Sequence, residues 1–494
     1  VQLITKVLAV YYECEKDERI PGVIYKVLKN YYELLRRGEI KLFDWGKFRW
    51  FETFIAIKFT YDRFKEDWLL KLAEILKEQG ADYNEFTELW KTPLNKQRFE
   101  THIVNMAMML KSEVLTSNLF NSAYTDSASR LCDILEKYNG TPVATFTGDE
   151  VLSGLSPIQG TELCSVTELM YSYEWLYAYT GNEKWAERLE LAAFNALPAA
   201  ISEDMWTHQY DQQSNQIACI QFPGKPIFRT NSGDAHLFGL QPNFGCCTAN
   251  FNQGWPKFAL SAFMYGENAV INVLPVPSRL KTDSFNINLE TEYPFKNSFK
   301  YTVNSETQFE FKIRIPSFAE NVTVNGEKAD IRELSFKITP CKNRDIRISY
   351  ETRPVLISRP YGLNTARCGS LVFSLPIKYE KRMHEYTHDG VERKFPYCDY
   401  ELIPQSDWNY AFCGDGLEAV RRTVGNSPFS ESEPPAVLKA SVCKIDWGFA
   451  DGYETVCGKI PHSAKPLSDT ETAELYPYGC AKLRMTEMPM AEKN

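Results

Sequence analysis

Residues 309–315 read Phe-Glu-Phe-Lys-Ile-Arg-Ile, with an apolar side chain at every second position. Such alternation predicts a β-strand with one buried face. The same period of two recurs in three other segments, 270–274, 285–289 and 346–350. Asn325-Gly326 supplies a hairpin signal between two strands, and 370–375 predicts a further strand. The chain after about residue 265 is therefore expected to form β-sandwich modules.

Before residue 265 the apolar residues recur with the period of an α-helix. We predict helices at 2–16, 21–37, 47–62, 66–79, 97–113, 119–139, 161–181, 183–200 and 250–264. Short polar turns join several of them into hairpins, for example the turn in which Gly181 follows a helix as a C-terminal cap. Repeated helical hairpins indicate an (α/α)6-barrel. A closed ring of this kind has twelve helices, about three more than the nine predicted here. The others are either missing from the N-terminus or not recognised in the sequence.

The predicted fold class is therefore multidomain, α then β. An (α/α)6-barrel-like domain, N-terminally truncated if helices are missing, is expected over 1–265. A β-sandwich domain is expected over 266–376, and a C-terminal β-rich module over 377–494. The length of 494 residues agrees with two or three domains.

Composition restricts the partners of the chain. The formal net charge is -9, which argues against the basic surface that nucleic acids or anionic membranes require. Aromatic residues make up 14% of the chain, a content that suits stacking on sugars and core packing alike. No apolar run is long enough to span a bilayer, and no signal peptide is recognisable. A cytoplasmic location is expected, although a leader before Val1 would have left no trace.

Two short segments bring metal ligands together. Glu162 and Cys164 open one predicted helix, and the adjacent pair Cys246-Cys247 precedes another. Three thiolates and a carboxylate favour zinc over magnesium or calcium. Residues two apart can share an ion only where the backbone is not yet regular helix. The alternatives are buried cysteines with a first-turn carboxylate, or a vicinal disulfide. Thirteen cysteines without dense spacing fit free thiols better than a disulfide framework.

The Glu162-x-Cys164 motif, followed by Gly245-Cys246-Cys247 inside the segment 241–250, Gln-Pro-Asn-Phe-Gly-Cys-Cys-Thr-Ala-Asn, resembles glycoside hydrolase family 127, GH127. The resemblance covers most of the chain, from about Val7 to Arg484. It implies a zinc held by Glu162, Cys164, Cys246 and Cys247. It also implies that Cys246 is the nucleophile.

The resemblance places the acid/base glutamate somewhat before the Glu-x-Cys motif. The residue that corresponds here is Glu150, and Asp149 stays an alternative. Without the resemblance, a solvated loop charge is the simpler interpretation of either. Further substrate contacts are expected at His102, Glu190, His208 and Tyr210. A buried core histidine is the plain alternative for His102, and a surface loop for His208 and Tyr210.

The implied activity is retaining hydrolysis of terminal β-L-arabinofuranose or a related plant-glycan sugar, with an oligosaccharide or glycan as partner. A homodimer is compatible with the sequence. Two alternatives belong to other classes: a non-catalytic, zinc-stabilised carbohydrate-binding protein, and a lyase or epimerase on a helical toroid. A carbohydrate-binding protein would need the thiolates but not Glu150. A lyase or epimerase would keep its activity in the presence of a metal chelator.

Overall fold

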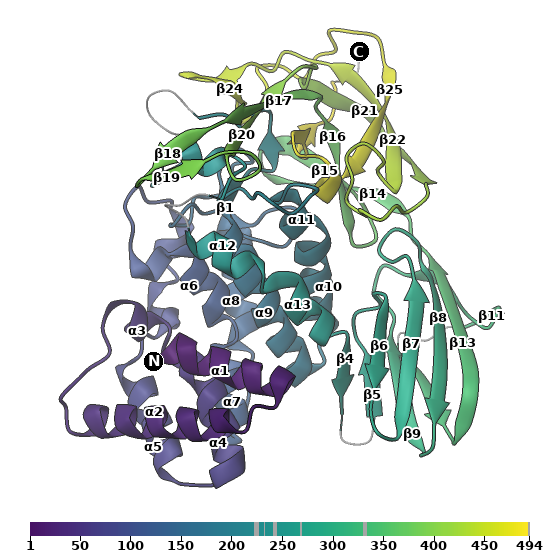
Figure 1. The fold of residues 1–494 in the computed structure, drawn as a ribbon. Helices are drawn as coiled ribbons and strands as arrows, with labels where there is room; N and C mark the ends of the chain where they lie inside the picture. Colours follow the sequence, from purple (N-terminus) through teal and green to yellow (C-terminus); the bar gives the residue numbers. More distant parts are fainter. Residues whose placement is uncertain (222–226, 232, 241–244, 267–268, 330–332, 493–494) are drawn as a thin grey trace.

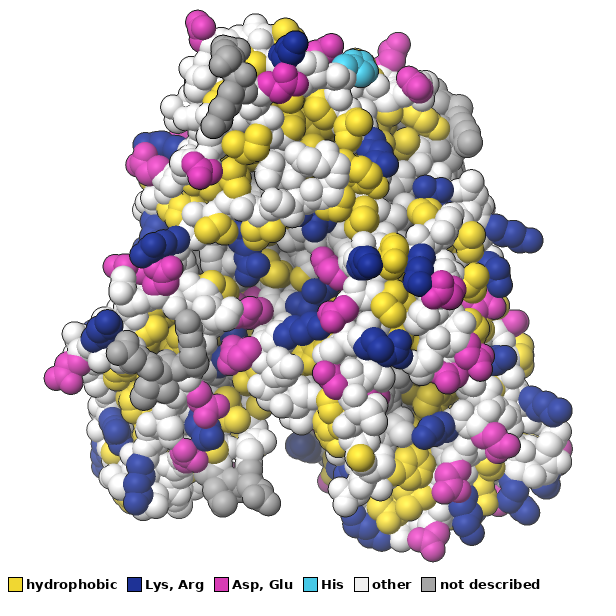
Figure 2. Space-filling model, turned by 180° about the vertical axis from the view of Figure 1, so that it is seen from behind, with side chains coloured by type: hydrophobic (Ala, Val, Ile, Leu, Met, Phe, Trp, Pro, Cys, Tyr) yellow, Lys and Arg dark blue, Asp and Glu magenta, His cyan; other side chains and the backbone are white. Residues whose placement is uncertain are grey.

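The computed structural model describes residues 1–221, 227–231, 233–240, 245–266, 269–329 and 333–492. These form a helical region, a β-sandwich beside it, and a larger C-terminal β-region that lies across one end of the helices (Figure 1). Seen from behind, a notch separates the sandwich lobe from the helical lobe (Figure 2). The first strand of the sandwich, β4, is Phe263–Tyr265, so the predicted order of helices before sheets is confirmed.

Helix α9 (Leu163–Thr180) is the centre of the helical region. Its residues are buried on every side almost to the last turn, as is expected of a helix that is surrounded by others. It packs against α6 (Ile103–Met109), α10 (Glu183–Leu191), α12 (Gly245–Phe251) and α13 (Gly254–Leu260). The predicted cap at Gly181 is confirmed, because this residue has a φ of 63° and donates its N–H to the Tyr177 carbonyl.

The N-terminal helices form a second packed group. They are α1 (Gln2–Glu15), α2 (Arg19–Arg36), α4 (Thr53–Phe64) and α5 (Trp68–Gln79). None of the helices within the described ranges is long and apolar enough to cross a membrane. Closure of all these helices into a barrel stays a prediction.

Several of the predicted helices are interrupted. The segment 47–62 is divided among the end of α3 (Asp44–Phe48), a 3-10 turn and α4. The segment 97–113 holds a 3-10 turn and α6, and α7 (Ser112–Phe120) starts separately. The segment 119–139 begins as α8 only at Ser127, because Asn121 adopts a φ of 50° and ends α7. The segment 250–264 contains the end of α12, all of α13 and the start of β4. Apolar periodicity alone did not reveal these breaks.

The β-sandwich consists of two sheets. The larger has the order β11 (Glu327–Lys328), β10 (Glu320–Val324), β13 (Cys341–Glu351), β8 (Ser298–Ser305), β7 (Phe285–Thr291), β6 (Ser278–Lys281). The smaller has the order β12 (Glu333–Ile338), β9, β5 (Ala269–Asn272), β4. Strand β9 (Phe309–Arg314) is the alternating segment from the sequence, with Phe311 and Ile313 buried. The predicted hairpin turn is confirmed, since Val324 pairs with Glu327 across Asn325 and Gly326, which both have positive φ.

The C-terminal β-region contains strands that the sequence groups with the middle domain. Strands β14 (Pro354–Ser358), β15 (Leu363–Cys368) and β16 (Leu371–Pro376) form one sheet with β25 (Glu471–Pro477), β22 (Ala436–Lys444) and β21 (Tyr410–Arg421). The sheet systems therefore change near residue 352 and not at 376. In the same sheet, β26 (Arg484–Met485) pairs with β3 (Asn215–Gln216), which ties it to the helical region.

Candidate active site and metal centre

The starts of α9 and α12 bring the predicted metal ligands together. Glu162 caps α9 with extended backbone, because it belongs to the short strand β1 (Thr161–Glu162), which pairs with β2 (Asp211–Gln212). Cys164 lies in the first turn of α9. Cys246 and Cys247 lie in the first turn of α12, which packs on α9. The irregular backbone that two ligands two residues apart require is therefore present at Glu162.

The four side chains form one compact group. The ligand atoms of Glu162, Cys164, Cys246 and Cys247 all lie within 4.8 Å of one another, and Sγ of Cys164 is 3.3 Å from Sγ of Cys247. All thirteen cysteines are free thiols, so this pair is not a disulfide. Zinc–sulfur bonds near 2.3 Å would place sulfurs about 3.8 Å apart in a tetrahedral site. The separations suit an ion of that size.

The charges of this group call for a cation. Burial raises the pKa of Glu162 well above its ordinary value, and the negative charges of Glu150 and Cys246 raise it further. Oε2 of Glu162 is buried and has no hydrogen-bond partner among the described residues. Burial likewise raises the pKa of Cys247. Hydrogen bonds from the Cys164 and Cys247 thiols lower the pKa of Cys246 to about 3. The raised pKa values favour the protonated forms of Glu162 and Cys247, and these two buried groups can be anionic together only if a cation neutralises them.

Glu150 lies on the edge of the same group. Its carboxylate belongs with His102 and Glu162 to a second set of ligand atoms within 4.8 Å of one another. Its backbone φ is 100°, a conformation that costs free energy in a non-glycine residue and that concentrates at functional sites. The amide N–H of Ile103 donates to the Glu150 carbonyl at 3.1 Å and helps to hold this conformation.

Three side chains donate to the Glu150 carboxylate, and one of them is the Gln97 amide, 3.3 Å from Oε2. His102 caps α6, and its Nδ1 accepts from the Asn105 amide, so Nε2 carries the proton and donates to Oε2 of Glu150 at 2.9 Å. The Tyr210 hydroxyl donates to Oε1. Burial raises the pKa of Glu150, but the hydrogen bonds from His102 and Tyr210 outweigh it, so this pKa is lowered.

The neighbouring Asp149 points elsewhere. Its Oδ2 accepts the backbone N–H groups of Thr230 and Asn231 at 2.7 and 3.0 Å, and its Oδ1 accepts from Ser153. Asp149 is fully buried, and burial raises its pKa. These contacts tie two chain segments together, whereas Glu150 lies beside the predicted metal ligands.

The two remaining predicted substrate contacts, His208 and Glu190, lie in different parts of the structure. Nε2 of His208 lies 2.9 Å from Oγ1 of Thr248, one residue after Cys247, so His208 braces the helix start that carries the thiols. Glu190 is not brought to this group. It is buried where α10 meets the sandwich, and it pairs with Arg314 and accepts from the Tyr293 hydroxyl. The residues Gln241-Pro242-Asn243-Phe244 of the predicted motif lie outside the described residues.

Trp45 is a neighbour of the site that sequence reasoning missed. Its ring packs edge-on against the His102 ring with centroids 4.8 Å apart, and the Arg49 guanidinium lies 4.4 Å from the Trp45 centroid. The indole is 40% exposed, which leaves it available to a ligand. No spacing rule links residue 45 to residue 102, because the contact arises only from tertiary folding.

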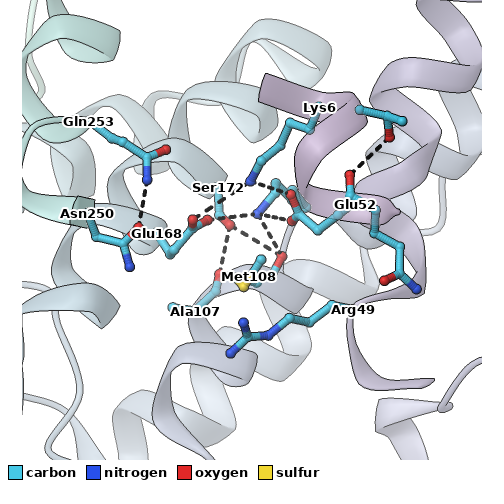
Figure 3. A network of polar contacts seen from close by, with 12 residues as sticks. Lys6, Arg49, Glu52, Ala107, Met108, Glu168, Ser172, Asn250 and Gln253 are labelled. Carbon is cyan, nitrogen blue, oxygen red and sulfur yellow. Dashed lines mark hydrogen bonds and ion pairs between the residues drawn. The ribbon is translucent and has the colours of Figure 1, made fainter. Parts of the chain in front are cut away.

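A buried network of charges lies between the N-terminal helices and α9 (Figure 3). Lys6 and Lys111 each lie 2.6 Å from a carboxylate oxygen of Glu52, and they also approach Glu168 at 3.8 and 3.4 Å. Glu168 lies one helical turn after Cys164 on α9. Although burial opposes the charge, the two lysines lower the pKa of Glu168. The network thus fixes the N-terminal helices to the helix that carries a predicted metal ligand.

Comparison with known proteins gives two kinds of match. Residues 270–338 match the family model described as β-L-arabinofuranosidase, GH127 middle domain. No curated protein sequence matches the chain. Solved structures share its fold, among them a GH127 β-L-arabinofuranosidase from Geobacillus stearothermophilus T6, with 15% identity and a TM-score of 0.65 over 99% of this chain and 79% of that one.

Two further structures are similar over nearly the whole chain. One is described as a glycoside hydrolase, with 12% identity and a TM-score of 0.55 over 99% of this chain and 91% of the other. The second is a GH127 β-arabinofuranosidase, with 12% identity and a TM-score of 0.52 over 98% and 87%. The organisation of helices followed by sheets is therefore that of solved glycoside hydrolases. Residues 270–338 are in addition similar in sequence to the GH127 middle domain.

Proposed function

We propose that the chain is a GH127-type retaining hydrolase that releases terminal β-L-arabinofuranose or a related plant-glycan sugar, because residues 270–338 match the GH127 middle-domain model and the fold is similar to that of a GH127 β-L-arabinofuranosidase. In this proposal Cys246 is the nucleophile and Glu150 is the general acid and base. Glu162, Cys164, Cys246 and Cys247 would hold a zinc ion.

One observation carries the proposal: Glu162 belongs both to the cysteine group and to the group of His102 and Glu150. A nucleophile and an acid/base residue must flank the same glycosidic bond, so they need to be neighbours. Among the three thiols, Cys164 and Cys247 are buried and Cys246 is exposed. Cys246 is therefore the thiol that a sugar could reach.

The proposed reaction has two steps. The Cys246 thiolate attacks the anomeric carbon, the bond to the leaving oxygen breaks, and Glu150 gives its proton to that oxygen. In the second step a water molecule gives a proton to Glu150 and attacks the same carbon. The carbon–sulfur bond then breaks and the thiolate is restored. Two displacements at one carbon retain its configuration.

The surroundings of Glu150 favour its carboxylate form, which is the base of the second step. The negative charge of Cys246 acts in the opposite direction, but the net pKa of Glu150 stays below its ordinary value. Once Cys246 carries the sugar, that charge is gone and the donors His102 and Tyr210 favour the carboxylate, which is the base. A bound zinc would supply the positive charge that keeps its cysteine ligands deprotonated.

Hydrolysis of p-nitrophenyl β-L-arabinofuranoside tests the proposal. The wild-type chain should release p-nitrophenol, and Cys246→Ala should not. Cys132→Ala is a matched control, because Cys132 is a buried free thiol on α8, away from the metal ligands. Equal rates for wild type and Cys246→Ala, or no hydrolysis of furanosides by a folded wild-type protein, would contradict the proposal.

A further inference from the structure

A separate cavity of about 470 Å³ lies where the helical region meets the C-terminal β-region. Its walls come from the turn 202–207, from β17 (Tyr379–His384) and β20 (Asp399–Pro404), and from Lys482, which precedes β26. A second cavity of about 290 Å³ adjoins it, since both are lined by Ser202, Glu203, Ser427 and Lys482. The two cavities therefore lie next to each other at this junction.

This space is distinct from the candidate reaction centre. Among the described residues that line it, none is a predicted catalytic, metal-binding or substrate-contact residue. Thr207 lines the cavity, and the next residue, His208, points to Thr248 beside the thiols. Because successive side chains of an extended segment point to opposite faces, the cavity and the reaction centre lie on opposite sides of this segment.

The polar lining offers both donors and acceptors. The Tyr379 hydroxyl donates to Glu431 at 2.6 Å, and Nζ of Lys482 donates to the Pro198 carbonyl at 2.7 Å. The charged side chains of the larger cavity are Glu203, Asp204, Glu431, Lys381 and Lys482, so neither sign dominates. A phosphate or a metal ion would call for one sign of charge, whereas hydroxyl groups use both donors and acceptors.

Aromatic rings accompany these polar groups. Trp206 and Tyr397 are 48% and 46% exposed, and their rings pack edge-on at 5.2 Å. Trp206 lines neither cavity itself, but it lies in the chain between Met205, which lines the smaller one, and Thr207, which lines the larger one. Trp255 stacks on Phe429 in the smaller cavity. Aromatic surfaces next to a few polar groups are typical of ligand pockets, and sugar rings have both polar edges and apolar faces.

We propose that these two adjoining cavities form a second glycan-binding site, which holds a neutral stretch of the polymer away from the reaction centre. Its polar groups would bind hydroxyls, and Trp206 would stack on a ring beside the cavities. Such a site keeps the polymer at high effective concentration near the reaction centre. Only the choice of arabinan as the probe rests on the proposed function.

Affinity gel electrophoresis with soluble arabinan tests the proposal, with dextran as the comparison polymer. The probe protein is the full chain carrying Cys246→Ala, which prevents degradation of the polymer. Arabinan should retard it more than dextran. Adding Trp206→Ala or Lys381→Ala should raise the dissociation constant at least about fivefold, the size of effect expected for a lost stacking or charged contact.

Tyr179→Ala is the matched control, since Tyr179 is also an exposed aromatic in an edge-on pair, with Tyr124, but lies at the end of α9. It should leave retardation unchanged. Thermal denaturation checks that each variant is folded. No retardation by arabinan, or equal retardation with and without both Trp206 and Lys381, would overturn the second site. Hydrolysis of the p-nitrophenyl glycoside tests the proposed function independently, because that small substrate does not need the second site.

Discussion

Nε2 of His102 lies 2.9 Å from Oε2 of Glu150, and Nδ1 of the same ring accepts from the Asn105 amide. The backbone thus fixes which nitrogen donates, and His102 positions the carboxylate. His102→Ala should lower kcat/KM by about tenfold to a hundredfold, since a hydrogen bond to a charged group contributes roughly 1.5–3 kcal/mol. His388→Ala, a change in the hairpin of β18 (Tyr386–His388) and β19 (Val391–Arg393), should have no effect. Unchanged kinetics for His102→Ala would remove His102 from the site.

Asp149 and Glu150 are adjacent, but we expect a structural role for the Asp149 carboxylate and a catalytic role for the Glu150 carboxylate. Glu150→Gln should slow turnover by about 10²–10⁴, the usual contribution of a general acid or base. A good leaving group should restore part of its first step, because departure then needs little protonation. Asp149→Asn should mainly lower the melting temperature, since Asp149 holds the Thr230 and Asn231 amides. Steady-state kinetics and calorimetry on both variants check this, and the reverse pattern would assign the acid to Asp149.

The metal ligands can be tested without activity. Elemental analysis of the purified chain should find about one zinc per molecule, because three thiolates and one carboxylate complete a tetrahedral set. Cys164→Ser should lose most of it, whereas Cys132→Ser, at another buried thiol, should keep it. A zinc-free protein with full activity would contradict the metal centre.

The buried network predicts a large loss of stability when one partner is removed. Glu52→Gln leaves Lys6 and Lys111 buried with one carboxylate between them, and should cost about 3–5 kcal/mol of unfolding free energy. The control Glu290→Gln, at the exposed pair with Lys300, should change stability by less than about 0.5 kcal/mol. Denaturant unfolding measures both, and equal small effects would mean that the network is not stabilising.

The same network predicts a pH dependence. The pKa of Glu168 is lowered from its ordinary value of 4.5, so the unfolded chain binds the proton more readily. The stabilisation by Glu168 is therefore complete above pH 4.5 and is lost as the pH falls below it. The difference in unfolding free energy between wild type and Glu168→Gln should shrink between pH 6 and pH 3. A difference that stays constant with pH would contradict the shift.

Parts of this organisation were predictable from the sequence, and others were not. Period-two alternation at 309–315 and the turn at Asn325-Gly326 are local signals, so both predictions are confirmed. The grouping of Glu162 with the cysteines followed from the family resemblance. The ion pair of Lys6 with Glu52 could not be predicted, because the two are 46 residues apart and each alone resembles a solvated charge.

The pairing of strands could not be predicted from the sequence either. The segment 370–375 is recognisable as a strand, but alternation does not say which sheet a strand joins. In the structure β16 pairs with β25, about a hundred residues later in the chain. The break at Asn121 depends on one left-handed residue that apolar spacing does not register. Long-range pairing and single-residue conformations are thus the features that require the structure.

The central claim is that the sugar is transferred to the sulfur of Cys246. The most direct measurement is mass spectrometry of the chain after reaction with a cyclophellitol-type or haloacetamide analogue of arabinofuranose. The proposal predicts one label per chain, on the peptide that contains Cys246, and no label in Cys246→Ala. A label on a carboxylate, or full activity of Cys246→Ala, would contradict the thiolate mechanism and favour a hydrolase with two carboxylates.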